Sequence, residues 1–257
     1  SSASSDASSS AAKTEKLQQI KDAGVLKVGT SAEYSPYEFH KVVDGEDKIV
    51  GFDDFVVQEI AKDMGVKVEY EDMDFDGLLG ALQADKVDIV LAGMTPDEKR
   101  KKSVDFSDIY YTNSNVCIVT KGKEDTIKKS EDLKDLKVGV QKGTTQADYV
   151  TNTLGISDAT QLKKIPDLML ELQNGKIDVI VTGKAVAEIN VKKYDNIAIG
   201  NTTVGDEVAE TAAAAIKKSG NGVDNTSFVK SVNDTIKRLQ DSGDMDKYMQ
   251  EALKLAE

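Results

Sequence analysis

Cysteine and histidine, which build most metal centres and many covalent catalytic sites, are scarce in this sequence. The single cysteine, Cys117, allows neither a disulfide framework nor a cysteine-based metal site. The single histidine, His40, makes a multi-histidine metal centre and a serine–histidine catalytic triad poor hypotheses. We expect His40 to lie in an exposed loop. The composition therefore points away from metal-dependent and triad-type catalysis.

The sequence also lacks long apolar runs and an excess of positive charge. No run approaches the roughly 20 apolar residues that a membrane-spanning helix needs. The net charge is −12 at pH 7, which argues against nucleic acid as a partner because phosphate binding needs a positive field. With 39% hydrophobic and 30% charged residues, the 257-residue chain is typical of a folded globular protein of one or two domains.

Residues 1–13 are predicted to form a flexible tether. Ser1–Ala12 reads SSASSDASSSAA, which is too small and polar to bury the apolar surface that folding requires. The chain begins without Met, so we expect that a signal peptide has been removed upstream. A Ser/Ala-rich tether follows the lipid-carrying cysteine of bacterial surface lipoproteins, so we expect a lipid anchor. An ordinary linker is the alternative.

Predicted strands and helices alternate along the rest of the chain. Apolar residues at helical spacing follow Asp53, a candidate N-cap, and end at Gly65. Such alternation predicts an α/β fold with largely parallel sheets. The expected helices cover residues 14–23, 54–64, 77–84, 147–152, 168–173, 185–192, 228–240 and 245–255, and the expected strands cover 25–29, 66–70, 87–91, 116–120, 136–140, 162–165, 177–181, 197–199 and 211–216.

Two short segments recur in the same order in the two halves of the chain. Leu82–Val90 (LQADKVDIV) resembles Leu172–Ile180 (LQNGKIDVI), and Leu26–Gly29 resembles Leu136–Gly139. The repetition indicates two domains built on one βαβ plan, although chance similarity is the alternative. The strand ends that follow the two longer segments would then be counterparts that face each other across a cleft.

The stretch Leu91–Asp108 (LAGMTPDEKRKKSVDFSD) has the composition of a carboxylate-binding loop. Its apolar strand ends at Gly93, and a hydroxyl, Thr95, and cations around Arg100 follow. In open α/β sheets, ligands bind at the C-terminal ends of the strands. The planar guanidinium of Arg100 can hold a carboxylate through two hydrogen bonds in a way that lysine cannot copy. We expect this loop to bind a small ligand's carboxylate; a solvated helix start around Arg100 is the alternative.

Several short motifs, each weak alone, occur in a fixed order from about Val25 to the C-terminus. They are Val28–Phe39 (VGTSAEYSPYEF), Gly51–Asp53 (GFD), Asp74–Leu79 (DFDGLL), Leu91–Thr95 (LAGMT) with Arg100, Val104–Tyr111 (VDFSDIYY), Val138–Thr145 (VGVQKGTT) and the Lys-Ile-Asp-Val segment from Lys176. In order and spacing they resemble the amino-acid-binding proteins of bacterial ABC importers (family 3 solute-binding proteins), which have the type II periplasmic-binding-protein fold.

This resemblance implies an α/β protein of two similar lobes, each with a central mixed, mostly parallel sheet. Lobe 1 would comprise residues 24–112 and 207–257, and lobe 2 would comprise residues 113–206. Two segments, near Asn113–Val119 and Ala209–Ile216, would cross between the lobes. A ligand that binds both lobes only in the closed form would shift the population toward closure.

The resemblance also implies a set of ligand-binding residues. Arg100 and the turn before it would bind the ligand carboxylate. Tyr34 and Phe52 would form walls around its side chain, and Thr145 would add backbone donors at a helix start. Both aromatic residues could instead belong to the core, and Thr145 could be a plain helix cap. The complete set is Ser31, Glu33, Tyr34, Phe52, Gly93, Met94, Thr95, Arg100, Gln141, Thr145, Gln146, Gly183 and Lys184.

The partner of the ligand's α-ammonium group remains open at this point. Many members of the family carry Asp or Glu where this chain has Gly183 and Lys184. Glu33 could bind the ammonium from the opposite lobe. Glu188 could also reach back to it, although Glu188 could simply pair with Lys184 at i, i+4. Alternatively, Lys184 binds a second anionic group. Glu33 beside aromatic residues favours a polar or cationic amino acid, whereas Lys184 favours an acidic one.

The leading interpretation is an extracytoplasmic solute-binding protein that captures a polar amino acid and delivers it to the membrane permease of an ABC importer. It would act as a monomer, without cofactor, metal or catalysis, and would touch the membrane only through a lipid anchor at the outer face of the cell membrane. Two alternatives are the ligand-sensing domain of a receptor and a dehydratase-like enzyme on the same fold. The enzyme would need a general acid or base in the cleft, for which Glu33 is the clear candidate.

Overall fold

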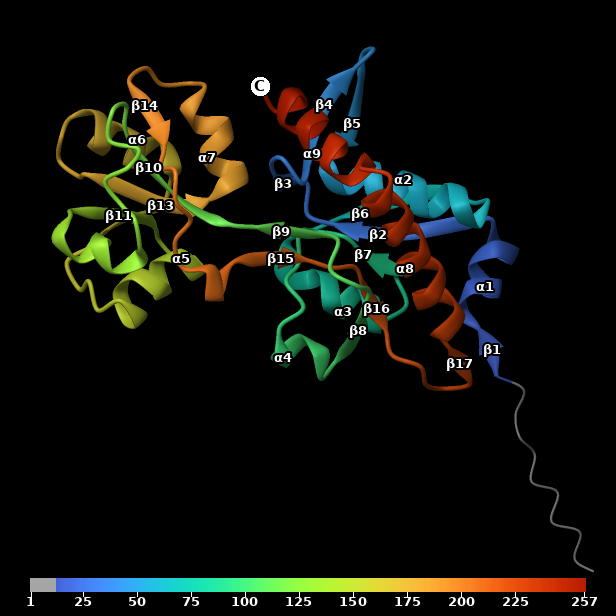
Figure 1. Ribbon diagram of the computed structural model, residues 1–257. Helices are drawn as coiled ribbons and strands as arrows, with labels where there is room; N and C mark the ends of the chain where they lie inside the picture. The colour runs from blue at the N-terminus through green and yellow to red at the C-terminus, as the bar shows by residue number, and fades with distance from the viewer. Residues whose placement is uncertain (1–12) are drawn as a thin grey trace, which may run out of the picture.

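Two β-sheets, each covered by helices, form two lobes (Figure 1). The structure, a computed structural model, describes residues 13–257, so the predicted tether lies outside the described residues except for Lys13. We call the lobe that contains the C-terminus lobe 1 and the other lobe 2. Among the described helices, none combines the length and the apolarity that crossing a bilayer requires.

The lobe 1 sheet is mixed and has the strand order β6–β2–β7–β16–β8. Strand β2 pairs in parallel with β6 and β7, whereas β16 is antiparallel to both β7 and β8. Strand β16 comes from the last quarter of the chain. Lobe 1 is therefore made of two separate stretches of sequence, one before and one after the lobe 2 stretch. The strands are β2 (Val25–Thr30), β6 (Lys67–Asp72), β7 (Ile89–Val90), β8 (Val104–Phe106) and β16 (Ala215–Lys217).

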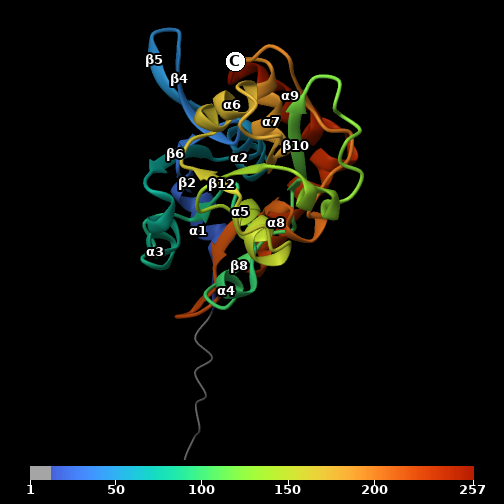
Figure 2. The ribbon, with the colours of Figure 1, turned by 90° about the vertical axis from the view of Figure 1, so that its left-hand side faces the viewer.

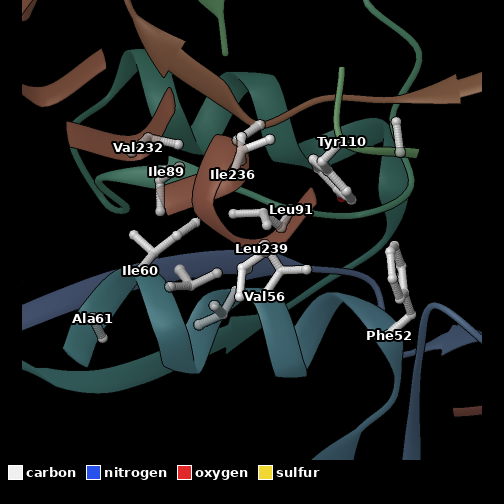
Figure 3. Close-up of a cluster of buried hydrophobic side chains, with 14 of the residues drawn as sticks. Phe52, Val56, Ile60, Ala61, Ile89, Leu91, Tyr110, Val232, Ile236 and Leu239 are labelled. Carbon is white, nitrogen blue, oxygen red and sulfur yellow. The ribbon is translucent and has the colours of Figure 1, made fainter. Parts of the chain in front are cut away.

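The main core of lobe 1 lies between this sheet and helices α2 (Phe52–Met64) and α8 (Thr226–Asp241). Buried side chains recur every three or four residues along each helix, such as Ile60 on α2 and Ile236 on α8, and they meet Ile89 of β7 (Figure 3). Burying each such side chain stabilises the fold by roughly 1.5–3 kcal/mol. The other lobe 1 helices are α1 (Lys16–Ala23), α3 (Leu78–Gln83), α4 (Glu98–Lys101) and α9 (Asp244–Leu255), and a short pair of strands, β1 (Thr14–Glu15) and β17 (Val223–Asp224), lies beside α1.

The start of α2 differs from the prediction, because Asp53 does not cap the helix. The helix begins one residue earlier, at Phe52, and Asp53 is buried in its first turn. The backbone N–H groups of Phe52 and Asp53 donate to the carbonyl oxygens of Pro36 (2.9 Å) and Tyr37 (2.8 Å). A neighbouring loop therefore satisfies the helix N-terminus, and the Asp53 carboxyl instead accepts hydrogen bonds from the Gly93 N–H and the Tyr110 hydroxyl.

The lobe 2 sheet repeats the plan of lobe 1, with the strand order β12–β11–β13–β10–β14. Strand β11 is parallel to β12 and β13, as β2 is parallel to β6 and β7, and β10 is antiparallel to β13 and β14. This match agrees with the repetition seen in the sequence. The elements are β10 (Asn115–Thr120), β11 (Val138–Gln141), β12 (Thr160–Leu162), β13 (Val179–Gly183), β14 (Ile197–Ile199), α5 (Thr145–Asp148), α6 (Ile165–Gln173) and α7 (Lys184–Val191).

Two short antiparallel strands, β9 (Tyr111–Asn113) and β15 (Glu210–Ala212), run between the lobes (Figure 1). The expected crossings overlap them, although β10 already belongs to the lobe 2 sheet. The strand predicted over residues 211–216 is two strands, β15 and β16, which lie in different sheets. Strands β8 and β9 had no counterpart among the predicted elements.

A small antiparallel sheet projects from lobe 1, as Figures 1 and 2 both show. It contains β3 (Glu33–Tyr34), β4 (Glu38–Val43) and β5 (Glu46–Val50). His40 is exposed, as predicted, but it lies in strand β4 rather than in a loop. Its ring nitrogens lie 3.1 Å from an oxygen of Asp47 and 2.6 Å from an oxygen of Asp72. The base of this sheet carries cleft residues, so its attachment to lobe 1 matters for the site.

We predict that Gly51→Ala destabilises the protein by about 2–3 kcal/mol. Gly51 has φ +127° and an added Cβ would lie 2.5 Å from the Tyr37 carbonyl oxygen, so either the backbone or the start of α2 must shift. Gly45→Ala is the matched control, because Gly45 also has positive φ but has nothing within 4 Å of its Cβ position. Urea denaturation measures both; equal losses would show that the close approach to Tyr37 is unimportant.

Candidate ligand-binding site

A cavity of about 870 Å³ opens between the lobes and beside the second crossing segment. Its walls come from the ends of lobe 1 strands, from the loop before α5 in lobe 2, and from the residues that lead into β15. A volume of this size accommodates a small organic ligand. The lining residues are Ser31, Glu33, Tyr34, Glu38, Phe75, Ala92, Gly93, Thr95, Asp97, Arg100, Gly143, Thr144, Thr145, Asp148, Glu207, Val208, Ala209 and Glu210.

The structure brings only part of the predicted set to this cavity. The predicted residues that line it are Ser31, Glu33, Tyr34, Gly93, Thr95, Arg100 and Thr145. Those that do not line it are Phe52, Met94, Gln141, Gln146, Gly183 and Lys184.

Arg100 is held at the cavity wall by contacts that leave most of its guanidinium N–H donors available. Its Nη1 donates to the Thr95 carbonyl oxygen (2.9 Å) and lies 3.4 Å from an Asp97 carboxylate oxygen. The guanidinium carbon stacks over the Phe75 ring at 5.4 Å from its centre, a cation–π contact. Among the described contacts only Nη1 is engaged, so Nε and Nη2 can hold a carboxylate through two hydrogen bonds. The side chain is 28% exposed, which suits a group that awaits a ligand.

The turn that precedes Arg100 is fixed by contacts within the protein. Gly93 has φ +57°, and an added Cβ would lie 2.9 Å from the Tyr34 ring. Its N–H donates to Asp53 (2.8 Å), so this backbone donor already has a partner. The Thr95 hydroxyl donates to the Thr211 carbonyl oxygen (2.8 Å) of β15. This loop is therefore tied to the second crossing segment.

Phe52 and Met94 do not form cavity walls, which corrects the prediction. Phe52 is 0% exposed and packs against Tyr110 and Tyr111 with ring centres 5.9 and 5.1 Å apart; Figure 3 shows it at the edge of the lobe 1 core. Met94 is buried in a second lobe 1 cluster, and its carbonyl oxygen accepts the Ala213 N–H (3.0 Å). The aromatic wall of the cavity is instead Tyr34, together with Phe75 beside Arg100.

On the lobe 2 side, Thr144 and not Thr145 caps helix α5. The Thr144 hydroxyl accepts the Ala147 N–H (3.1 Å) and donates to the Gln141 carbonyl oxygen (2.7 Å). Thr145 is exposed and faces the cavity, so it is not a plain cap. The Gln141 side chain turns away and donates to the Lys163 carbonyl oxygen (3.0 Å).

Gly183 and Lys184 are outside the cavity for a steric reason. A Cβ on Gly183 would lie 2.4 Å from Nδ2 of Asn113, so a side chain from the first crossing segment occupies this space. The Asn113 amide oxygen also accepts the Ala185 N–H (3.1 Å). Lys184 is largely exposed and its Nζ lies 4.0 Å from Glu188. Lys184 and Glu188 therefore form the simple i, i+4 pair, and neither of them lines the cavity.

Glu210 is a cavity residue that the sequence did not reveal. It lies on β15 directly opposite Asn113, the residue that fills the space beside Gly183. One carboxylate oxygen accepts the Tyr34 hydroxyl of lobe 1 (3.2 Å), and the other accepts Nε2 of Gln146 in lobe 2 (3.4 Å). Burial, and then Glu210, raise the pKa of Tyr34, so its hydroxyl remains a donor. Glu210 thus connects the two lobes at the back of the cavity.

Glu38 is the second unpredicted acid at the cavity, and it is 1% exposed. Within the described residues, neither of its carboxyl oxygens has a hydrogen-bond partner. Burial, and then the neighbouring Asp53, raise the pKa of Glu38 well above its usual range. Burial likewise raises the pKa of Asp53, although this carboxyl accepts hydrogen bonds from Gly93 N–H and the Tyr110 hydroxyl.

The cavity is strongly acidic. Among the described residues that line it, Arg100 is the only cation. The acidic lining residues are Glu33, Glu38, Asp97, Asp148, Glu207 and Glu210. They come from lobe 1, from lobe 2 and from the segment that leads into β15, so closing the lobes without a cation would bring like charges together.

The chain matches the family described as bacterial extracellular solute-binding proteins, family 3, over residues 26–254. It belongs to this family. Among known proteins it is 36% identical over 225 residues to the arginine-binding extracellular protein ArtP of Bacillus subtilis (strain 168). That alignment covers 86% of this chain and 83% of ArtP. It is 31% identical over 229 residues to the L-cystine-binding protein TcyJ of Escherichia coli (strain K12), covering 88% and 82% of the two chains.

The structure is also similar to solved members of this family. An amino acid ABC transporter substrate-binding protein from Streptococcus pneumoniae Canada MDR_19A, bound to L-arginine, aligns with a TM-score of 0.71 and 31% identity. The alignment covers 94% of this chain and 98% of the other. These solute-binding relatives confirm the predicted type II periplasmic-binding-protein fold.

We predict that the free energy of unfolding falls as the pH rises from 5 to 8, and that Glu38→Gln reduces this fall. Because burial raises the pKa of Glu38, the native protein binds its proton more tightly than the unfolded chain does, and that advantage is lost above the unfolded value of 4.5. The loss is about 1.4 kcal/mol per pH unit until the folded-state pKa is reached.

Chemical denaturation at pH 5 and pH 8 tests this prediction. Glu33→Gln is the matched control, since Glu33 is an exposed acid of the same cavity. We expect Glu33→Gln to keep the pH dependence of the wild type. Identical pH dependence in all three proteins would contradict the neutral, buried state of Glu38.

Proposed function

We propose that this chain is the extracytoplasmic receptor of an ABC importer for a cationic amino acid, with L-arginine as the leading ligand. The observation that carries the proposal is the charge of the cavity, where six acidic residues face a single guanidinium. A free amino acid needs a partner for each charge that is removed from water. One cation and several anions suit a ligand with one carboxylate and more than one positive group.

Arg100 is the proposed partner of the ligand carboxylate. Its Nε and Nη2 are available for a bidentate contact, and the Phe75 ring and the Thr95 carbonyl oxygen hold the guanidinium in place. Thr145 faces the cavity from lobe 2 and would add a hydroxyl and a backbone N–H to the carboxylate as the lobes close.

Glu210 is the proposed partner of the α-ammonium group. Glu188 pairs with Lys184 away from the cavity, which disfavours both residues for this role. Glu33 remains a second candidate, since it lines the cavity from lobe 1. Glu210 is favoured for two reasons. It lies opposite Asn113, the residue that fills the space next to Gly183, where many members of the family carry an acid. It also already contacts both lobes.

The names of similar proteins support a cationic ligand. ArtP is described as arginine-binding, and the solved Streptococcus pneumoniae protein contains L-arginine. TcyJ is described as binding L-cystine, which carries two carboxylates. A second carboxylate would need a second cation, and the described residues that line this cavity provide only Arg100. The charge of the site therefore favours arginine over cystine.

We extend the proposal to how the protein works. The lobes, residues 24–112 with 207–257 and residues 113–206, would close around the ligand, with β9 and β15 as the hinge. The receptor would act as a monomer tethered by a lipid anchor and would deliver its ligand to the permease. It would do no chemistry, which its membership of a solute-binding family supports.

A thermal-shift and calorimetry panel of arginine, lysine, glutamine and glutamate tests this function. We expect arginine and lysine to raise the Tm most and to bind at least about tenfold more tightly than glutamine, because only they supply the second cation. Glutamate should bind least, since its second carboxylate would face the acidic wall. Preferential stabilisation by glutamate, or by none of the four, would contradict the proposal.

Arg100→Ala should weaken arginine binding by about 2–5 kcal/mol, because it leaves the ligand carboxylate without its partner. The matched control is Lys101→Ala, which removes an adjacent cation that pairs with Glu98 on the surface and should leave binding unchanged. Agmatine, which lacks the carboxylate, should bind Arg100→Ala at least as tightly as it binds the wild type, because the variant removes a like charge. Wild-type arginine affinity in Arg100→Ala would remove Arg100 from the site.

A further inference from the structure

Two buried carboxyl groups lie side by side behind the cavity wall, and no role described so far uses them as a pair; of the two, only Glu38 lines the cavity. Glu38 comes from strand β4 and Asp53 from the first turn of α2, and both are almost completely buried. Asp53 has donors, the Gly93 N–H (2.8 Å) and the Tyr110 hydroxyl. Glu38 lines the cavity and, among the described residues, no N–H or hydroxyl group donates to either of its oxygens; the polar group beside it is the Asp53 carboxyl. A buried acid without a donor is costly unless it is neutral or awaits a cation.

The groups around the pair contribute no positive charge directly. The titratable groups that act on the two carboxyls are Tyr34 from β3, Tyr37 from the segment between β3 and β4, Asp54 from α2, Tyr70 and Asp72 from β6, and Tyr110. Beyond these groups, Nε2 of the exposed His40 lies 2.6 Å from a carboxylate oxygen of Asp72. Two carboxylates side by side cannot both be charged cheaply, which favours one shared proton on the pair.

We propose that Glu38 and Asp53 form a proton-releasing subsite for the distal cation of the ligand, the guanidinium or side-chain ammonium group. The proposal rests on the cationic-amino-acid function argued above. Arg100 and Glu210 would take the two charges of the amino-acid backbone. The distal group is then left for Glu38, the buried lining acid to which no described N–H or hydroxyl group donates.

The exchange balances in charge and in atoms. The empty pair carries one proton and one negative charge. When the distal cation enters, the O–H bond of the protonated carboxyl breaks and the proton passes to solvent. The Glu38 carboxylate then faces the cation with the Asp53 carboxylate behind it, and the net charge of the subsite with its ligand is again one negative charge.

The Glu38–Asp53 subsite would also select among ligands. A guanidinium or ammonium group supplies the charge that makes the second carboxylate stable in a buried place. A neutral side chain of similar length, such as that of citrulline, cannot do so and leaves the proton in place. Affinity for arginine should therefore rise with pH, by up to about tenfold per unit while the pair keeps its proton, and affinity for citrulline should not.

Calorimetric titration of L-arginine into the wild-type protein at pH 7, in buffers of different ionisation enthalpy, measures the protons released. We expect release to approach one proton per arginine. Glu38→Gln should bind arginine more weakly and release almost none. His40→Gln is the matched control: His40 also titrates nearby but is exposed on the far side of Asp72, so its variant should keep the release.

The outcomes separate this proposal from the function on which it rests. Arginine binding with no proton release in the wild type overturns the subsite and leaves the receptor function intact. Equal release with citrulline overturns the assignment to the distal group. Loss of the release in His40→Gln but not in Glu38→Gln would assign the proton to His40. If neither arginine nor lysine binds, both proposals fail.

Discussion

Removal of charge from water is the constraint on which the cleft depends. A free amino acid has a carboxylate and an ammonium group, and a cationic one has a third charge. A closing cleft must provide a partner for each, because an unpaired buried charge costs several kcal/mol. The distribution of charge in this cavity, one guanidinium among six acidic residues, is the pattern that such a ligand requires. Without a ligand the same acids repel one another, which favours an open cleft.

The second crossing segment, which we propose as part of the hinge, also contributes residues to the cavity. Glu210 on β15 contacts Tyr34 of lobe 1 and Gln146 of lobe 2, and its neighbour Thr211 binds the Thr95 hydroxyl in the loop that precedes Arg100. A ligand that competes for Glu210 therefore acts on the strand that joins the lobes. This arrangement gives a physical route from binding to closure, since the hinge and one wall of the site share residues.

The fold and the place of Arg100 at the cavity could be predicted from the sequence because they depend on local patterns. Apolar runs mark the strands, helical spacing marks α2 and α8, and Arg100 follows its strand within one loop. The acids of the site could not be found this way. Glu210 precedes a run of alanines, and Glu38 lies between two aromatic residues, so nothing local shows that either faces a cavity. Phe52 was misplaced because a buried aromatic and a wall aromatic have the same sequence pattern; only tertiary packing separates them.

Three contacts with one ligand summarise the account: Arg100 with a carboxylate, Glu210 with an ammonium, and Glu38 with a distal cation. A crystal structure of the protein with L-arginine tests all of them at once. We predict closed lobes, with the carboxylate on Nε and Nη2 of Arg100 and the guanidinium against Glu38. A ligand bound in the reverse orientation, with its guanidinium near Arg100, or bound outside the cavity, would contradict the account.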